Sequence, residues 1–248
     1  MSSDPGPDPD RPAFYALSPG GWRDYWTLLH PPYTLWHLSY VVMGAALAPH
    51  VSARWLSETL LAFFLAMGIA AHALDELHGR PLATRIPDAT LRALAVIGLA
   101  GAVGLGIDGA RAISPWIWLF IVSGVFLVVA YNLELFGGVV HSNLWFALAW
   151  GAFPVLTAFF AQTGTVRAEA VILAAACAAI SEGQRLLSTP VRRLRRDVSM
   201  VQGTVTLRDG TTELIDGDTI RSAPESALRW LSLAMPLTAA AWLMARLV

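Results

Sequence analysis

The sequence predicts an all-α polytopic membrane protein that carries a small cytoplasmic β-hairpin insert. Of its 248 residues, 55% are hydrophobic and 14% are charged. The mean hydropathy is +0.53, which is more apolar than the usual balance of soluble domains. A run of about 20 apolar residues crosses a hydrocarbon core of about 30 Å. Runs near this length predict about seven transmembrane helices, at residues 33–49, 56–74, 89–107, 113–133, 143–162, 168–187 and 228–247.

Residues 1–31 predict a polar N-terminal tail that ends in an interfacial aromatic segment. The first residues are rich in proline and contain no apolar core of the signal-peptide type. Aromatic side chains then gather just ahead of the first apolar run, as is typical of an aromatic belt: Phe14, Tyr15, Trp22, Tyr25 and Trp26. We expect this segment to lie flat on the bilayer, and transmembrane helices 1–6 to occupy residues 32–191.

Small residues and prolines shape the predicted helices. Gly98, Gly101 and Gly104 fall in the third apolar run, where they allow close approach of neighbouring helix backbones. Pro154 and Pro236 lie inside the fifth and seventh runs. Each proline removes one backbone hydrogen bond, so we expect a bend at both positions.

Residues 192–226 interrupt the apolar pattern and predict a basic cytoplasmic loop with a β-hairpin. Strand-like residues flank the pair Asp209-Gly210, and an Asp-Gly pair between such runs is a strong hairpin signal. The hairpin is also a candidate contact for a partner protein. Residues 227–248 then form the last predicted transmembrane helix.

The basic residues predict the orientation of the chain. There is no lysine, and the chain has 17 arginines. Most of them fall on one side when the N-terminus is cytoplasmic, as the positive-inside rule requires. We therefore expect an integral protein of a bacterial inner (plasma) membrane, with membrane lipid around it. The net charge of −1 gives no indication of nucleic-acid binding, and without lysine no pigment can be held as a Schiff base.

The candidate catalytic residues gather where the second apolar run ends, in GIAAHALDELHGRPLATRIP. His72, Asp75 and Glu76 are spaced three and four residues apart, so they share one helix face. Ionisable groups at this depth are costly and mark a functional site; the alternative is a solvated helix end with local ion pairs. Imidazole with carboxylates suits a divalent metal or acid–base chemistry. His37, in the first apolar run, is a further candidate, unless it only hydrogen-bonds a neighbouring helix.

Polar residues at the ends of other predicted helices fall on the same side of the membrane. We expect them to bind substrate, and phosphate is the chemistry that clustered arginines recognise; anionic lipid headgroups are the alternative. The candidate substrate-binding residues are Arg80, Tyr131, Asn132, Asn143, Arg185, Arg192 and Arg193. Glu182 adds a carboxylate on this side.

The order of three segments resembles the UbiA superfamily of intramembrane prenyltransferases over roughly residues 28–190. LLHPPYTLWHLSYVVMGAALAP resembles the first helix of that family, and GIAAHALDELHGRPLATRIP stands where its first aspartate-rich motif lies. YNLELFGGVVHSNLWFALAWGAFPVLTAFFAQTG resembles the segment that joins its fourth and fifth helices.

The resemblance implies a UbiA-like helical bundle with a cavity open to the cytoplasm. It also implies Mg²⁺, held by acidic motifs, that binds the diphosphate of an isoprenoid substrate and stabilises the leaving group. When the acidic motifs of the family are matched to this chain, the resemblance implies Asp75, Glu76 and Glu182 as the metal ligands. When the Asn of the first motif is matched to His72, its acidic positions fall on Ala73, Glu76 and Arg80. When its first Asp is matched to Asp75, the other two acidic positions fall on His78 and Leu82, so neither register keeps three carboxylates.

Three functions are therefore open at the level of sequence. The first is a prenyl-diphosphate enzyme in which arginines take over part of the diphosphate charge. The second is altered chemistry on the same scaffold, as in a terpene cyclase or hydrolase, where the histidines favour Zn²⁺ or Fe over Mg²⁺. The third is a non-enzymatic bundle that holds a lipid or pigment.

Overall fold

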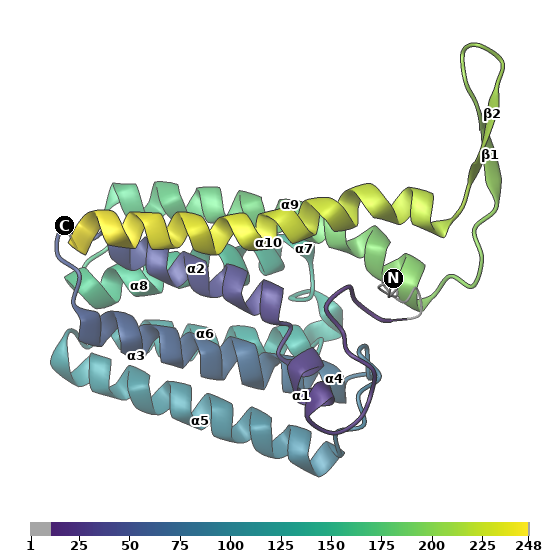
Figure 1. Cartoon of the computed structure of the whole chain (residues 1–248). Coiled ribbons are helices and arrows are strands. Elements are labelled where there is room, and N and C mark those ends of the chain that lie inside the picture. The colour runs from purple at the N-terminus through teal and green to yellow at the C-terminus, as the bar shows by residue number, and fades with distance from the viewer. Residues whose placement is uncertain (1–10, 248) are drawn as a thin grey trace, which may run out of the picture.

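The computed structural model is a bundle of long helices from which one β-hairpin projects (Figure 1). It describes residues 11–247, and the side chains of residues 11–246. The first ten residues of the predicted tail lie outside the described residues. The elements run in the order α1 (Trp22–Leu28), α2 (Pro31–Leu47), α3 (Ala53–Phe63), η1 (Phe64–Ala71), α4 (His72–Leu77), α5 (Asp88–Ala112), α6 (Ile117–Asn132), η2 (Phe136–Gly138), α7 (Asn143–Phe146), η3 (Ala147–Ala152), α8 (Phe153–Thr163), α9 (Ala168–Arg196), β1 (Gly203–Thr206), β2 (Thr212–Ile215) and α10 (Gly217–Leu247).

Each predicted apolar run lies largely within a helix, and the described chain is confirmed as mostly helical with a small hairpin. Five helices are long and apolar enough to cross a membrane: Ala53–Leu77, Asp88–Ala112, Asn143–Thr163, Ala168–Arg196 and Gly217–Arg246. α6 is apolar but has only 16 residues, and α2 has 17. Seven transmembrane spans therefore stay a prediction.

Two of the long helices contain a π-helical segment. η1 lies between α3 and α4, and η3 lies between α7 and α8. π-helical turns are rare and occur frequently at functional sites. The bend predicted at Pro154 lies next to η3, which ends two residues before it. Because Pro154 has no N–H, the Trp150 carbonyl four residues earlier lacks its α-helical donor, and the His37 Nδ1–H donates to it instead, at 2.9 Å.

The core of the bundle lies around α2. This helix packs against α8 and α10, while α9 packs against η3 and α10, and α5 packs against η1. Trp36, Tyr40 and Phe159 are among the largest fully buried side chains. The Tyr40 hydroxyl oxygen accepts from the Trp36 Nε1–H at 2.6 Å and from the Ser181 hydroxyl at 3.2 Å. Polar atoms in an apolar bundle need such partners.

The hairpin is confirmed, but the basic run before it is helical and not a loop. β1 and β2 pair antiparallel, with Thr204 opposite Leu214. α9 continues past Pro190 to Arg196, and α10 begins at Gly217, ten residues before the predicted start. Buried Arg195 explains the extension, because its Nη2 atom lies 2.7 Å from Glu225 Oε2 on α10. This tertiary ion pair holds the end of α9 against α10.

Glycines allow several helices to touch through their backbones. A Cβ at Gly151 would lie 2.6 Å from the Cys177 carbonyl oxygen on α9. A Cβ at Gly98 would lie 2.6 Å from the Leu65 carbonyl oxygen, which confirms the expected close approach there. A Cβ at Gly104 would meet nothing within 4 Å, so this glycine is not needed for packing.

We predict that Gly151→Leu destabilises the bundle by about 1–3 kcal/mol, because η3 must then move away from α9. Gly104→Leu is the matched control, since the same side chain enters open space. The measurement is the thermal unfolding midpoint of the two variants in the same detergent. Equal midpoints would contradict the close contact between η3 and α9.

Candidate functional site

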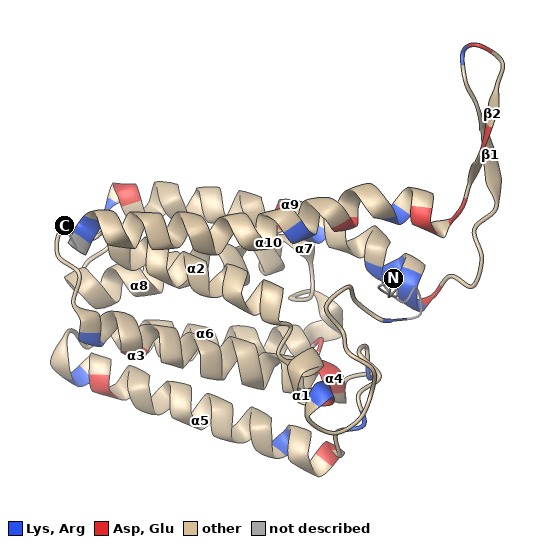
Figure 2. Ribbon diagram, in the orientation of Figure 1, with Lys and Arg blue, Asp and Glu red and all other residues tan. Residues whose placement is uncertain are grey.

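Charged residues gather at the two ends of the bundle and leave the middle of the helices nearly uncharged (Figure 2). One end, here called the arginine-rich end, carries α1, α4, the end of α9 and the start of α10. The opposite end carries the start of α3, the end of α5, the start of α9 and the end of α10. Arg54, Arg111, Arg167 and Arg246 lie at these helix ends. The candidate site residues, apart from the deeper His37, lie at or near the arginine-rich end.

Glu76 and Arg80 hold the loop that follows α4. The fully buried Glu76 carboxylate accepts from the Leu82 N–H at 3.0 Å, and from the N–H and hydroxyl of Thr84, each at 2.8 Å. Arg80 donates to the Thr84 and Ile86 carbonyl oxygens and pairs with the Asp88 carboxylate. Both Glu76 oxygens are thus occupied by protein donors, and the geometry gives these residues a structural role.

His72 faces inward and stacks on His30, which precedes α2. The two ring centroids are 4.2 Å apart and the rings are 23° from parallel. His30 has a left-handed backbone with φ of 47°, a strained conformation of the kind found at functional sites. Its Nδ1 atom lies 2.5 Å from the Tyr15 hydroxyl, and its buried Nε2 atom has no hydrogen-bond partner among the described residues.

The Asp75 carboxylate lies beside the last two turns of α9. The charges of Arg192, Arg196 and His141 act on it most strongly. It has no hydrogen bond or ion pair within the part of the chain that the structure describes. Asp75 is partly exposed, so a bound ligand can reach it.

Tyr131 and Arg185 form the other side of this group. The Arg185 guanidinium donates to the Tyr131 hydroxyl, and its Nε–H donates to Asn143 Oδ1 at 2.7 Å. The Tyr131 ring stacks on His141, with ring centroids 4.4 Å apart. Arg185 is thereby held in one orientation by α6 and α7. We call the whole set the polar cluster: Tyr15, His30, His72, Asp75, Tyr131, His141, Arg185, Arg192 and Arg196.

The environment keeps the polar cluster rich in hydrogen-bond donors and poor in negative charge. Burial lowers the pKa of His30 well below its usual value, and the charges of His72, Arg196 and Arg192 lower it further. Burial likewise raises the pKa of the Tyr15 hydroxyl well above its usual value. At neutral pH both groups are therefore uncharged.

Three histidines share one hydrogen-bonding arrangement. His37, His72 and His141 each place Nδ1 on a backbone carbonyl, those of Trp150, Gly68 and Tyr131, at 2.9, 3.1 and 3.0 Å. A carbonyl only accepts, so Nδ1 carries the proton and the neutral ring keeps a lone pair on Nε2. Each of these rings can therefore accept a proton at Nε2.

Residues 11–21 run across the arginine-rich end and tie it to α9. Arg195 and Arg196 donate to the Arg11 and Pro12 carbonyl oxygens at 3.1 and 3.4 Å. Phe14 packs edge-on against Tyr33 and under the Arg229 guanidinium. This differs from the expected interfacial segment, because the first aromatic residues of the segment pack on the bundle, while Trp22 on α1 is 69% exposed.

The structure brings only part of the predicted site together. His72, Asp75, Tyr131, Arg185 and Arg192 belong to the polar cluster, and Asn143 supports Arg185. The remaining predicted residues are not members of it. The Asn132 side chain donates to the Val128 carbonyl oxygen, Arg193 is exposed on the outer face of α9, and Glu182 has a buried Oε2 atom with no partner among the described residues.

Sequence reasoning missed Tyr15, His30 and Arg196 as site residues. Tyr15 was interpreted as one member of an aromatic belt, because its partner His30 lies fifteen residues later in the chain. Arg196 lies eleven residues after Arg185, which is close to three helical turns and therefore the same face of α9. The helical spacing 185, 192, 196 would have identified it.

The implied Mg²⁺ does not fit the ligands that the resemblance suggested. Among the described residues, there is no group of three or more His, Cys, Asp and Glu side chains that could hold a metal ion. Of the predicted ligands, Glu76 has both oxygens bonded to its own loop, Asp75 faces two arginines, and Glu182 belongs to no such group of side chains within the described residues. The same finding gives no support to a Zn²⁺ or Fe site, so both metals stay predictions from sequence.

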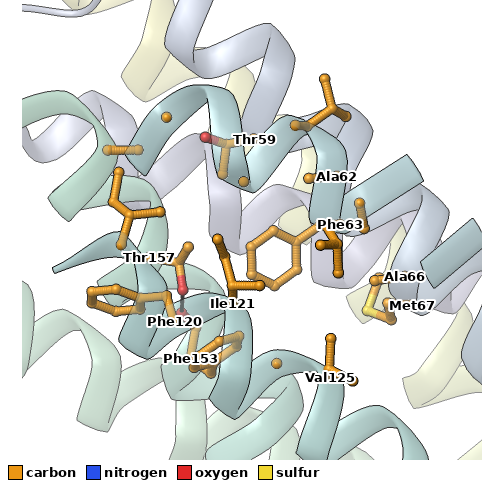
Figure 3. Close-up of a pocket in the computed structure, with 18 of the residues that line it drawn as sticks. Thr59, Ala62, Phe63, Ala66, Met67, Phe120, Ile121, Val125, Phe153 and Thr157 are labelled. Carbon is orange, nitrogen blue, oxygen red and sulfur yellow. Dashed lines mark hydrogen bonds between the residues drawn. The ribbon is translucent and has the colours of Figure 1, made fainter. Parts of the chain in front are cut away.

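An apolar cavity of about 130 Å³ lies between α3, η1, α5, α6 and α8. The rings of Phe63, Phe120 and Phe153 surround it, with Ala66 and Met67 toward one side (Figure 3). Trp150 also lines it and contacts Tyr131 edge-on, with ring centroids 5.8 Å apart. An apolar cavity of similar size, about 150 Å³, binds benzene in another protein. This cavity can therefore hold a short hydrocarbon group; it reaches the polar cluster at Trp150 and extends toward the opposite end of the bundle, where Trp55 and Ile113 line it.

Comparisons of the chain with protein-family models, curated proteins and solved structures found no match.

We predict opposite effects for the two neighbouring carboxylates. Glu76→Gln replaces one accepting oxygen with a donor, which leaves a buried N–H of the loop unpaired, so it should lower stability by about 1–3 kcal/mol. Asp75→Asn removes no hydrogen bond and should cost less than about 0.5 kcal/mol. Thermal unfolding of both variants, with limited proteolysis of the loop 78–87, measures the difference. Equal destabilisation would refute the structural role of Glu76.

Proposed function

We propose that this protein is an integral membrane enzyme that acts on an isoprenoid diphosphate, with UbiA-like prenyl transfer as the reaction. The single observation that carries the proposal is the position of the apolar cavity beside the polar cluster, linked by the contact between Trp150 and Tyr131. A substrate with a hydrocarbon group and a charged phosphate head matches this pair of environments. The order of motifs in the sequence supports the same substrate class.

In this proposal the diphosphate binds to the guanidinium groups of Arg185, Arg192 and Arg196. Charge-assisted hydrogen bonds from arginine to phosphate are among the stronger polar contacts in proteins. The hydrocarbon group enters the apolar cavity, where aromatic rings such as Phe120 and Phe153 can stabilise a neighbouring cation.

The proposed reaction breaks the bond between the allylic carbon and the diphosphate oxygen. The electron pair of that bond leaves on the diphosphate, where the arginines stabilise the new charge. The allylic carbon then bonds to the acceptor, and the proton lost by the acceptor goes to His72 Nε2, which has the required lone pair. The Asp75 carboxylate stabilises the positive charge on the carbon and then on the His72 ring.

We further propose that the arginine-rich end faces the cytoplasm of a bacterial cell, which places the N-terminus inside. The distribution of arginine between the two ends supports this orientation. A soluble diphosphate product would then be released into the cytoplasm. The exposed hairpin β1–β2 would lie on the same side, where it is available to a partner protein.

The test of the function is pyrophosphate release from a panel of prenyl diphosphates by the purified protein in lipid nanodiscs. We expect release by the native protein and a loss of at least about 100-fold in the Asp75→Asn variant, since a charge in direct support of a transition state contributes at this level. Release that is unchanged in Asp75→Asn would contradict the assigned role. Binding of a prenyl diphosphate with no release would indicate a lipid-binding protein.

A larger side chain in the cavity should weaken binding of the substrate's hydrocarbon group and leave binding of its diphosphate unchanged. We predict that Ala66→Phe raises the KM for a prenyl diphosphate about tenfold, since burial of a few methylene groups is lost. Inorganic pyrophosphate should bind as before, because its site is the polar cluster. Ala100→Phe, on the exposed face of α5, is the control. An equal rise in both variants would indicate that the hydrocarbon group lies elsewhere.

A further inference from the structure

Two sets of arginines at the arginine-rich end differ in their partners. Arg80, Arg195, Arg221 and Arg229 each pair with a carboxylate, which is Asp88 for Arg80, Glu225 for Arg195 and Arg229, and Asp218 for Arg221. Within the described chain, Arg185, Arg192 and Arg196 form no ion pair with any carboxylate. Their hydrogen bonds go to neutral acceptors.

The three unpaired arginines share one face of α9, because they are spaced by seven and four residues. Arg193 lies between two of them in sequence but is exposed on another face. Arg192 and Arg196 act electrostatically on each other as well as on Asp75. Like charges held together in a partly buried place are unfavourable unless an anion neutralises them.

The carboxylates near this face do not balance its charge. Asp75 is the one that faces Arg192 and Arg196 from α4. Asp197 also acts on Arg196 but is exposed, and the half-exposed Glu134 lies 3.9 Å from His141 at the rim. Exposed charges are screened by water and salt, so they contribute little. Of the carboxylates that act on Arg196, Asp75 is thus the one that is not exposed.

A divalent cation would make this imbalance worse. It would bring two more positive charges to a place where Asp75 is the carboxylate without a hydrogen-bond partner, and the carboxylate of Glu76 is already occupied. A diphosphate, by contrast, supplies negative charge and many acceptors to a set of donors. The donors also include the Arg185 fork, which Tyr131 and Asn143 hold in position.

We propose that the protein binds the diphosphate group of its ligand directly through Arg185, Arg192 and Arg196, without a divalent cation. This inference deepens the proposed function and rests on it for the identity of the ligand. Arg196, and not the sequence-predicted Arg193, completes the set. The same phosphate chemistry could be offered by a soluble pyrophosphate, a prenyl diphosphate or a lipid headgroup, so the experiment must separate these sources.

The test measures binding to the full-length protein in nanodiscs of phosphatidylcholine, by calorimetry and by the shift of the unfolding midpoint. The probes are inorganic pyrophosphate and a prenyl diphosphate, each titrated in EDTA and in Mg²⁺. We expect the prenyl diphosphate to bind in EDTA at least as tightly as in Mg²⁺. Binding of either probe only when Mg²⁺ is present would overturn the proposal.

Arg192→Gln should weaken binding in EDTA by at least about tenfold, because one charge-assisted contact to phosphate is lost. Arg193→Gln is the matched control on the adjacent, outward position and should leave binding unchanged. If Arg192→Gln fails to fold, Arg196→Gln replaces it in the same assay. Equal weakening by the inward and outward variants would refute the site, since it would reflect surface charge alone.

Nanodiscs that contain phosphatidylglycerol separate the lipid headgroup from the diphosphate. We expect the prenyl diphosphate to bind equally in their presence, whereas strong competition would overturn the assignment to a diphosphate. The experiments can reject the cation-free binding site and the enzymatic function independently of each other. Binding in EDTA without pyrophosphate release leaves the inference intact and rejects the enzyme, while release that depends on Mg²⁺ keeps the enzyme and rejects the inference.

Discussion

The bundle depends on one constraint, which is that polar groups inside apolar helices need hydrogen-bond partners. Water is scarce at this depth, and an unpaired polar group is costly. His37 meets the constraint through the Trp150 carbonyl, which Pro154 leaves without its α-helical donor. His72 meets it through Gly68, within the other π-helical segment. Both solutions leave a lone pair on Nε2, so the same contacts that satisfy the fold also prepare these rings for proton transfer.

At the arginine-rich end, buried charged groups likewise need partners of opposite charge. Several arginines there pair with carboxylates, and the single buried carboxylate of Glu225 pairs with both Arg195 and Arg229. The polar cluster differs, because its inward arginines have no carboxylate partner within the described chain. Arg185, Arg192 and Arg196 on α9 therefore keep their positive charge available for an anionic ligand. The apolar cavity beside Trp150 supplies the matching place for a hydrocarbon group.

The sequence predicted those features that depend on local pattern, and it missed those that depend on distant contacts. Apolar runs located the long helices, and Asp209-Gly210 located the hairpin, because both signals lie within a few residues. The extension of α9 to Arg196 depends on Glu225, thirty residues away. Glu76 looked like a metal ligand, yet its role is set by backbone N–H groups of the following loop, which no spacing of side chains reveals.

The central claim is that the phosphorylated head of the ligand binds at the arginine-rich end. A spin label on a cysteine at position 193 tests it directly, through its effect on the ³¹P resonance of a bound prenyl diphosphate. The native Cys177 is buried, and His50→Cys places the same label at the opposite, exposed end. We predict strong broadening of the ³¹P signal by the label at position 193 and little by the label at position 50. The reverse pattern, or equal broadening by both labels, would contradict the account.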